Sequence, residues 1–140
     1  MQLTDEEFQW VLKFTDGRVN YIHIDFRLSL DLVDASGKAS LTIETPCRLK
    51  GAGGEVPLTP SEPSSLAPIL PLFNAKVIGV GMQKTGQLKV EFGDGHTLEV
   101  DPDDSYEAWQ LGCSSGSMLV CSPGGKVSFF QQTERPTKAT

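Results

Sequence analysis

The sequence predicts a mainly β fold, an antiparallel sandwich or a partly open barrel, with one short helix. Three observations lead to this prediction. Apolar and polar residues alternate over residues 21–33, short alternating runs separated by glycine and proline recur along the chain, and an apolar run at 66–73 contains prolines. The length of 140 residues and the hydrophobic content of 39% fit one globular domain. We place this domain at residues 1–132 and a flexible tail at 133–140.

The alternation over residues 21–33 is typical of a β-strand, because side chains along a strand point to opposite faces with a period of two. One row comprises Ile22, Ile24, Phe26, Leu28, Leu30 and Leu32, and the other comprises Tyr21, His23, Asp25, Arg27, Ser29 and Asp31. A strand of this kind needs a core on one side only. The polar row is therefore expected to face water or a partner.

The residues before this strand predict a first strand and a hairpin. Residues 8–14 alternate in the same way, and Asp16-Gly17 is a dipeptide that supplies positive φ angles in tight turns. We therefore expect two antiparallel strands joined at Asp16-Gly17. Residues 41–43 should return along the long strand until Pro46, which lacks a backbone donor.

The middle of the chain predicts a loop, a seam and the helix. Residues 51–54 are rich in glycine, and the proline- and serine-rich residues 60–65 indicate an internal seam. Ser64 or Ser65 is placed to cap a helix of one or two turns over residues 66–73. The large apolar side chains expected to cover an open end or face of the sheet are Leu66, Ile69, Leu70 and Leu72.

The second half of the chain repeats the pattern of the first. Residues 28–34 and 88–94 share apolar positions at the same spacing and a closing aspartate, and each run precedes an apolar return toward a proline. Two hairpins related by pseudo-symmetry explain this pattern, and so does the general likeness of amphipathic hairpins. The final strands are expected at 107–111, 118–121 and 126–131.

Charge restricts the partners that the chain can bind. Twelve basic and eighteen acidic residues give a formal net charge of −6 at pH 7. Because lysine and arginine form no cluster, nucleic acid is not an expected partner. The negative charge favours a basic protein partner through faster encounter, although it also serves to keep a small protein soluble.

The expected location is the cytoplasm. Residues 1–7 are acidic and do not resemble a secretory signal, and no apolar stretch reaches the roughly 18 residues of a membrane span. The three cysteines, Cys47, Cys113 and Cys121, fit no metal-binding spacing and are expected to be reduced thiols. The alternative is that Cys113 and Cys121 face each other across a hairpin.

The sequence predicts no catalytic site, metal site or cofactor. Its two histidines are His96, in an expected turn, and His23, whose neighbour on the polar row is Asp25. The carboxylates of residues 101–107 offer oxygen ligands but lack the glycine and distal glutamate of a calcium loop. No glycine-rich segment precedes a helix with the lysine, serine or threonine of a phosphate-binding loop.

Tyr106 and Trp109 have the character of interface residues, because each joins a large contact area to a polar group. Trp109 is equally a candidate for the core, because aromatic side chains dominate the cores of small domains. The candidate binding residues are His23, Asp25, Arg27, Tyr106 and Trp109.

Four segments resemble a family of small uncharacterised bacterial proteins known only as a domain of unknown function. These segments are residues 25–30 (DFRLSL), 86–95 (GQLKVEFGDG), 106–111 (YEAWQL) and 120–125 (VCSPGG). The resemblance covers the chain from about residue 18 to residue 130. Such families are loosely similar to the immunity proteins that accompany bacterial toxins, and the resemblance assigns no active residue.

These observations favour a non-enzymatic protein-binding module that uses an acidic surface bearing aromatic residues. The specific form of this hypothesis, which the family resemblance suggests, is an immunity-protein-like module. The competing hypothesis is a small-molecule-binding protein or enzyme with a pocket at the barrel mouth. A third hypothesis is an assembly subunit that associates through exposed strand edges.

Overall fold

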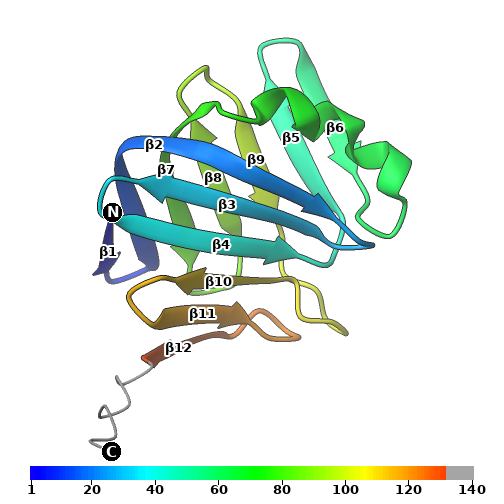
Figure 1. Cartoon of the computed structure of the whole chain (residues 1–140). Helices are drawn as coiled ribbons and strands as arrows, with labels where there is room; N and C mark the ends of the chain where they lie inside the picture. Colours follow the sequence, from blue (N-terminus) through cyan, green and yellow to red (C-terminus); the bar gives the residue numbers. More distant parts are fainter. Residues whose placement is uncertain (132–140) are drawn as a thin grey trace, which may run out of the picture.

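The computed structural model describes residues 1–131, in which twelve strands form one antiparallel sheet that is not closed into a barrel (Figure 1). The elements in chain order are β1 (Gln2–Asp5), β2 (Gln9–Ile24), β3 (Leu28–Asp34), β4 (Gly37–Ile43), β5 (Cys47–Gly51), β6 (Gly54–Leu58), the 3₁₀ helix η1 (Pro63–Leu72), β7 (Lys76–Gln83), β8 (Leu88–Phe92), β9 (Thr97–Val100), β10 (Trp109–Cys113), β11 (Ser117–Cys121) and β12 (Val127–Gln131). The predicted fold class, mainly β with one short helix, is confirmed. The tail predicted at 133–140 lies outside the described residues.

Strand β2 turns a corner and so belongs to both parts of the sheet (Figure 1). Its first part pairs with β1 and β7, and its second part pairs with β3. The corner is a bulge between Lys13 and Gly17 in the pairing with β7, and Asp16 there has a φ of 54°. A Cβ atom on Gly17 would lie 2.5 Å from the Cβ of Phe14, so only glycine fits.

Two predictions about this region are wrong. Asp16-Gly17 is not a hairpin turn, because its positive φ serves the bulge inside β2 instead. The predicted strand at 21–33 is in fact the end of β2, a turn at 25–27 and the start of β3. The alternation continues through this hairpin because a turn of three residues keeps Ile24 and its partner Leu28 on the same face.

The strands lie in two layers around β2 (Figure 1). The front layer comprises β3, β4, β10, β11 and β12, and the back layer comprises β7, β8, β9, β5 and β6. One hydrophobic core takes side chains from both layers, among them Leu30, Leu41 and Leu111 from the front and Val80, Val90 and Leu98 from the back. Burial of such side chains is the main source of stability for the fold.

The strand order is symmetric about the pair formed by β2 and β7. It reads β10-β4-β3-β2 on one side and β7-β8-β9-β5 on the other, so each half consists of a long strand and a hairpin. The two predicted hairpins are therefore present as β3–β4 and β8–β9. The strand that follows each hairpin in the sequence pairs with the other half. Strand β5 follows β4 and pairs with β9, and β10 follows β9 and pairs with β4.

Strands β1, β5 and β7 were not expected from the sequence. In β7 the glycines at 79 and 81 occupy positions where an amphipathic strand would show side chains. They hide the alternation on which strand prediction rests. The last three strands lie within about two residues of their predicted bounds.

The helix covers part of the core, but its start and type differ from the prediction. It is a 3₁₀ helix that follows Glu62 and has no side-chain cap, and Ser65 instead donates its hydroxyl to the carbonyl of Thr59. Pro68 and Pro71 lack the N–H groups that a longer α-helix needs. Of the four predicted covering residues, Leu66, Ile69 and Leu72 are buried and Leu70 is exposed.

All three cysteines are buried and free. Cys113 and Cys121 lie at opposite ends of the β10–β11 hairpin, where Cys121 is opposite Trp109, so the alternative that they face each other is wrong. Burial raises the pKa of Cys47 to about 12. In residues 1–131 the structure contains no helix long and apolar enough to cross a membrane.

The outer surface of the back layer carries a network of charges centred on Glu99. This buried carboxylate lies 2.7 Å from the ammonium of Lys50, 3.3 Å from Arg48 and 3.6 Å from Lys89. Arg48 also pairs with Asp101. The hydrogen bond from Lys50 lowers the pKa of Glu99, and the hydrogen bond from Arg48 lowers the pKa of Asp101.

We predict that Glu99→Gln destabilises the fold by about 1 to 3 kcal/mol at pH 7, because the three cations lose their shared anion. A carboxylate with a lowered native pKa contributes stability above its unfolded pKa, and this contribution is lost as the pH falls through the native value. The gap in unfolding free energy between wild type and Glu99→Gln should therefore narrow from pH 6 to pH 2. Urea unfolding at each pH measures it.

The matched control is Glu7→Gln, which neutralises an exposed carboxylate on the β1–β2 turn. It should change the unfolding free energy by less than about 0.5 kcal/mol. If the difference in unfolding free energy between wild type and Glu99→Gln stays constant with pH, the Glu99 carboxylate is not the source of this stability.

Candidate functional site

The turn between β2 and β3 presents an aromatic side chain to solvent. Phe26 is 69% exposed and has a φ of 67°, in the left-handed region that suits glycine and asparagine. A non-glycine residue in this region costs roughly 1 to 2 kcal/mol. The sequence placed Phe26 in the apolar row facing the core, and this prediction is wrong because residue 26 lies in the turn.

The turn between β7 and β8 has glycine at the position that corresponds to Phe26. Gly86 lies two residues before the start of β8, as Phe26 lies two residues before the start of β3, and it also has a positive φ, of 117°. This second turn is covered, because Pro102 and Gly125 pack against Gly86 and the indole of Trp109 donates to its carbonyl at 2.8 Å. Phe26 is therefore strained, exposed and without a role in the core.

Three of the predicted site residues meet beside Phe26. Arg27 donates to both carboxylate oxygens of Asp25, at 2.9 and 3.3 Å, and His23 lies 3.4 Å from the same carboxylate. The Tyr21 hydroxyl lies 3.4 Å from His23, and the two rings are stacked. The hydrogen bond from Arg27 is the largest cause of a lowered pKa at Asp25. We call Tyr21, His23, Asp25, Phe26 and Arg27 the hairpin-tip site.

The polar groups of the hairpin-tip site are paired with one another. Both oxygens of Asp25 accept hydrogen bonds from Arg27, so the carboxylate is already engaged and the guanidinium is held in place. His23 contacts both the Tyr21 hydroxyl and the carboxylate of Asp25. A fixed guanidinium next to an exposed aromatic ring is a common feature of protein interfaces.

The loop between β9 and β10, which carries Tyr106, lies at the same end of the sheet as the turn between β2 and β3 (Figure 1). Tyr106 is 69% exposed on this loop. The end of this loop is tied to the end of β4, because the N–H of Glu44 donates to the carbonyl of Ala108. The hydrogen bond to Asp25 is the main cause of the raised pKa of Arg27, and the charge of Glu44 adds to it.

Trp109 is completely buried, as the alternative of a core position predicts. It begins β10 and contacts the β7–β8 turn through its indole N–H. Trp109 therefore packs between the two layers and is not part of the hairpin-tip site.

The loop bearing Tyr106 is acidic. The carboxylate of Asp103 accepts hydrogen bonds from the N–H groups of Ser105 and Tyr106, and Asp101 is paired with Arg48. The loop itself carries the carboxylates of Asp103, Asp104 and Glu107. In residues 1–131 no group of three or more side chains is arranged to hold a metal ion.

Sequence reasoning missed a trough on the outer surface of the back layer. It runs over Gly79 and Gly81 of β7, and the side chain of Gln9 from β2 lines it. The available signal was the pair of glycines inside an otherwise apolar run at 77–82. A glycine in a strand marks a bulge or a place where another group approaches closely.

Residues 10–131 match the model of a family described as "Family of unknown function (DUF6188)". The match spans most of the chain, so the protein belongs to this family. The predicted likeness to an uncharacterised family is thereby confirmed at the level of the family. No curated protein and no solved structure matches the chain.

We predict that Phe26→Asn leaves the fold as stable as wild type or stabilises it by up to about 1 kcal/mol, because asparagine tolerates the left-handed region. Phe26→Ala removes the same ring but keeps the strain, so it should be less stable than Phe26→Asn. Chemical unfolding of the three proteins measures the difference. A loss of about 3 kcal/mol or more in Phe26→Asn, as for a core aromatic, would contradict this description.

Proposed function

We propose that the chain is a non-enzymatic protein-binding module that presents the hairpin-tip site to a partner protein. The observation that carries the proposal is the exposed Phe26 in a left-handed conformation, where glycine or asparagine would fit at lower cost. Strain that a fold retains without structural benefit is often connected with function. An exposed aromatic residue is also the kind of anchor that dominates binding energy.

The site is prepared for binding before a partner arrives. Arg27 is already fixed by two hydrogen bonds to Asp25, so less side-chain freedom is lost on association. Full burial of the Phe26 side chain in an apolar pocket contributes about 1.5 to 3 kcal/mol. Tyr106 adds a second exposed aromatic side chain on the loop between β9 and β10.

The charge of the site favours a basic partner. The loop bearing Tyr106 is acidic, Arg27 is neutralised by Asp25, and the whole chain has a net charge of −6. Opposite charge on the partner speeds encounter and orients the two surfaces. We therefore propose a partner with an apolar pocket surrounded by lysine and arginine.

A more specific form of the proposal is an immunity-protein-like role, in which the partner is a bacterial toxin. Its support is the resemblance of the motifs at residues 25–30 and 106–111 together with the acidic surface. We also propose a bacterial origin and a cytoplasmic location. The three buried free cysteines support this location, because a reducing compartment preserves thiols.

The test measures binding of the protein encoded by the neighbouring gene to the immobilised chain. Phe26→Asn should weaken binding at least about tenfold, because an apolar anchor is lost while the turn is kept. The matched control is Phe73→Asn, which removes another exposed phenylalanine, at the end of the 3₁₀ helix, and should leave affinity unchanged. Raising the salt concentration should slow association more than it speeds dissociation.

Two outcomes would overturn the proposal. One is equal affinity for wild type and Phe26→Asn. The other is absence of protein binding combined with a raised unfolding midpoint in a small-molecule library, which would support the competing hypothesis of a ligand-binding protein or enzyme.

A further inference from the structure

Gly81 has no structural reason to be glycine. It lies inside β7, between β2 and β8, and its φ is not left-handed. A Cβ atom there would have the flexible Gln9 amide as its nearest neighbour, at an ordinary 3.5 Å. Gly79 differs, because a Cβ would lie 2.8 Å from the carbonyl oxygen of Leu12. A side chain at 81 would favour the strand, so its absence keeps the surface above β7 open.

The two glycines form the floor of a trough along β7. Two hollows of about 430 and 180 Å³ share Gln9, Gly81 and Glu91, so they are parts of one continuous depression. Side chains of β2 form one wall and side chains of β8 form the other. The wall residues directly beside the two glycines are Val11 and Lys13 on β2 and Lys89 and Glu91 on β8.

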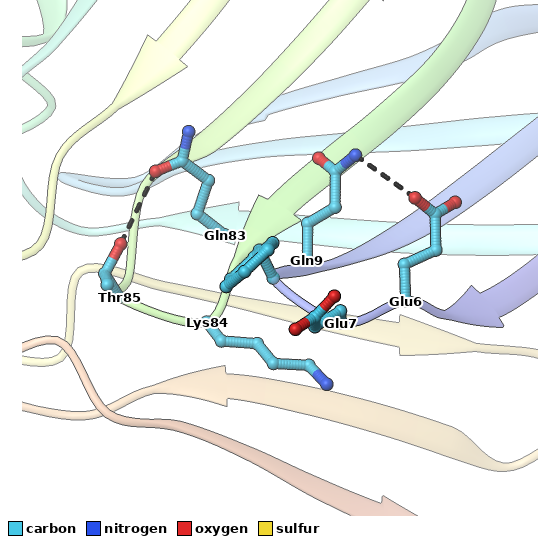
Figure 2. Close-up of a pocket in the computed structure, with 7 residues that line it drawn as sticks. Glu6, Glu7, Gln9, Gln83, Lys84 and Thr85 are labelled. Atoms are coloured by element: carbon cyan, nitrogen blue, oxygen red, sulfur yellow. Dashed lines mark hydrogen bonds between the residues drawn. The ribbon is translucent and has the colours of Figure 1, made fainter.

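One end of the trough carries two side-chain amides. Figure 2 shows that Gln9 and Gln83 point to the same side, next to a hollow of about 640 Å³ between the β1–β2 and β7–β8 turns. Gln9 donates to Glu6, and Gln83 accepts from the hydroxyl of Thr85, each at 3.4 Å. The ammonium of Lys84 points away from the amides (Figure 2). The amides are thus steadied by neighbours and open to the trough.

The other end of the trough is apolar. Ile78 is 55% exposed there, and Phe14 contributes to the lining. Between the two ends, Lys13 and Glu91 lie on opposite sides of Gly79. The trough therefore offers amides, a pair of opposite charges and an apolar end in succession along one strand.

We propose that this trough binds an extended peptide segment of a partner protein, lying along β7. A glutamine amide has both a donor and an acceptor, and so it can pair with the C=O and N–H of a peptide backbone. Gly81 lets that backbone approach the sheet. From Gln83 to Ile78 the strand rises about 17 Å, the length of about five extended residues.

The charges and the apolar end define the sequence that would fit. Lys13 and Glu91 complement a peptide carrying one acidic and one basic side chain, and Ile78 provides contact for an apolar side chain. This inference rests on the proposed function for the existence of a protein partner, and it adds a second surface distinct from the hairpin-tip site.

The test uses a phage-displayed library of random dodecapeptides panned on the whole chain. The enriched peptides are synthesised, and their affinities for purified variants are measured by fluorescence polarisation. Gly81→Val fills the trough and should weaken binding at least tenfold, while the unfolding midpoint stays the same or rises. The control Gly112→Val fills an outward-facing glycine on β10, where a Cβ lies 3.8 Å from Met118, and should leave affinity unchanged.

A second variant keeps the test decisive if Gly81→Val folds poorly. Gln83→Leu removes one amide without filling the trough, and it should lower the affinity for the same peptides at least fivefold. Unchanged affinity in Gln83→Leu, or in a well-folded Gly81→Val, would overturn the proposal. Enrichment of no peptide above the bare support would also overturn it.

The hairpin-tip variant separates this inference from the proposed function. Peptides whose affinity is lowered by Gly81→Val and not by Phe26→Asn would support binding in the trough. Peptides whose affinity is lowered only by Phe26→Asn would overturn the proposal of binding in the trough. They would leave the hairpin-tip site as the protein-binding surface. Binding of a neutral oligosaccharide that Gly81→Val abolishes, in the absence of peptide binding, would assign the trough to a different ligand and overturn the peptide proposal.

Discussion

The corner in β2 is the constraint on which the rest of the structure depends. Because β2 stays paired with β7 on both sides of the bulge, one continuous strand connects the front and back layers. The corner needs Gly17, where a Cβ would also lie 2.7 Å from the carbonyl oxygen of Val77, and it needs the positive φ of Asp16. Once the strand turns, the apolar rows of both layers face each other and enclose one core.

The two halves that meet at β2 and β7 have the same strand order but different surfaces. In the second half the turn at Gly86 is covered by the β9–β10 loop and the β11–β12 turn, and it accepts a hydrogen bond from Trp109. In the first half the turn at Phe26 is open and carries a strained aromatic residue beside an ordered Arg27. A nearly symmetric scaffold thus has one turn that serves packing and one that is exposed. On the back layer, Gly81 leaves a trough that packing does not require.

Sequence reasoning found the fold class because strands of half-buried sheets alternate with period two, and it found most strands for the same reason. It failed where one local signal has two structural uses. Asp16-Gly17 supplies a bulge as readily as a turn, and a turn at 25–27 of three residues leaves the alternation of its strands unbroken. Trp109 and Tyr106 have similar chemistry, and only the packing of the layers separates the buried residue from the exposed one. The open space above Gly81 can be recognised only when its neighbours on β2 and β8 are known.

The most direct test of this account is the set of interstrand nuclear Overhauser effects of β2, measured by NMR on the isotope-labelled chain. The account predicts contacts between Leu12 and Val80 before the corner and between Gly17 and Val77 after it, with Ile24 opposite Leu28 across the hairpin. Contacts between residues 8–14 and 18–24 would show that Asp16-Gly17 is a hairpin turn. They would contradict the continuous strand and, with it, the exposed position of Phe26.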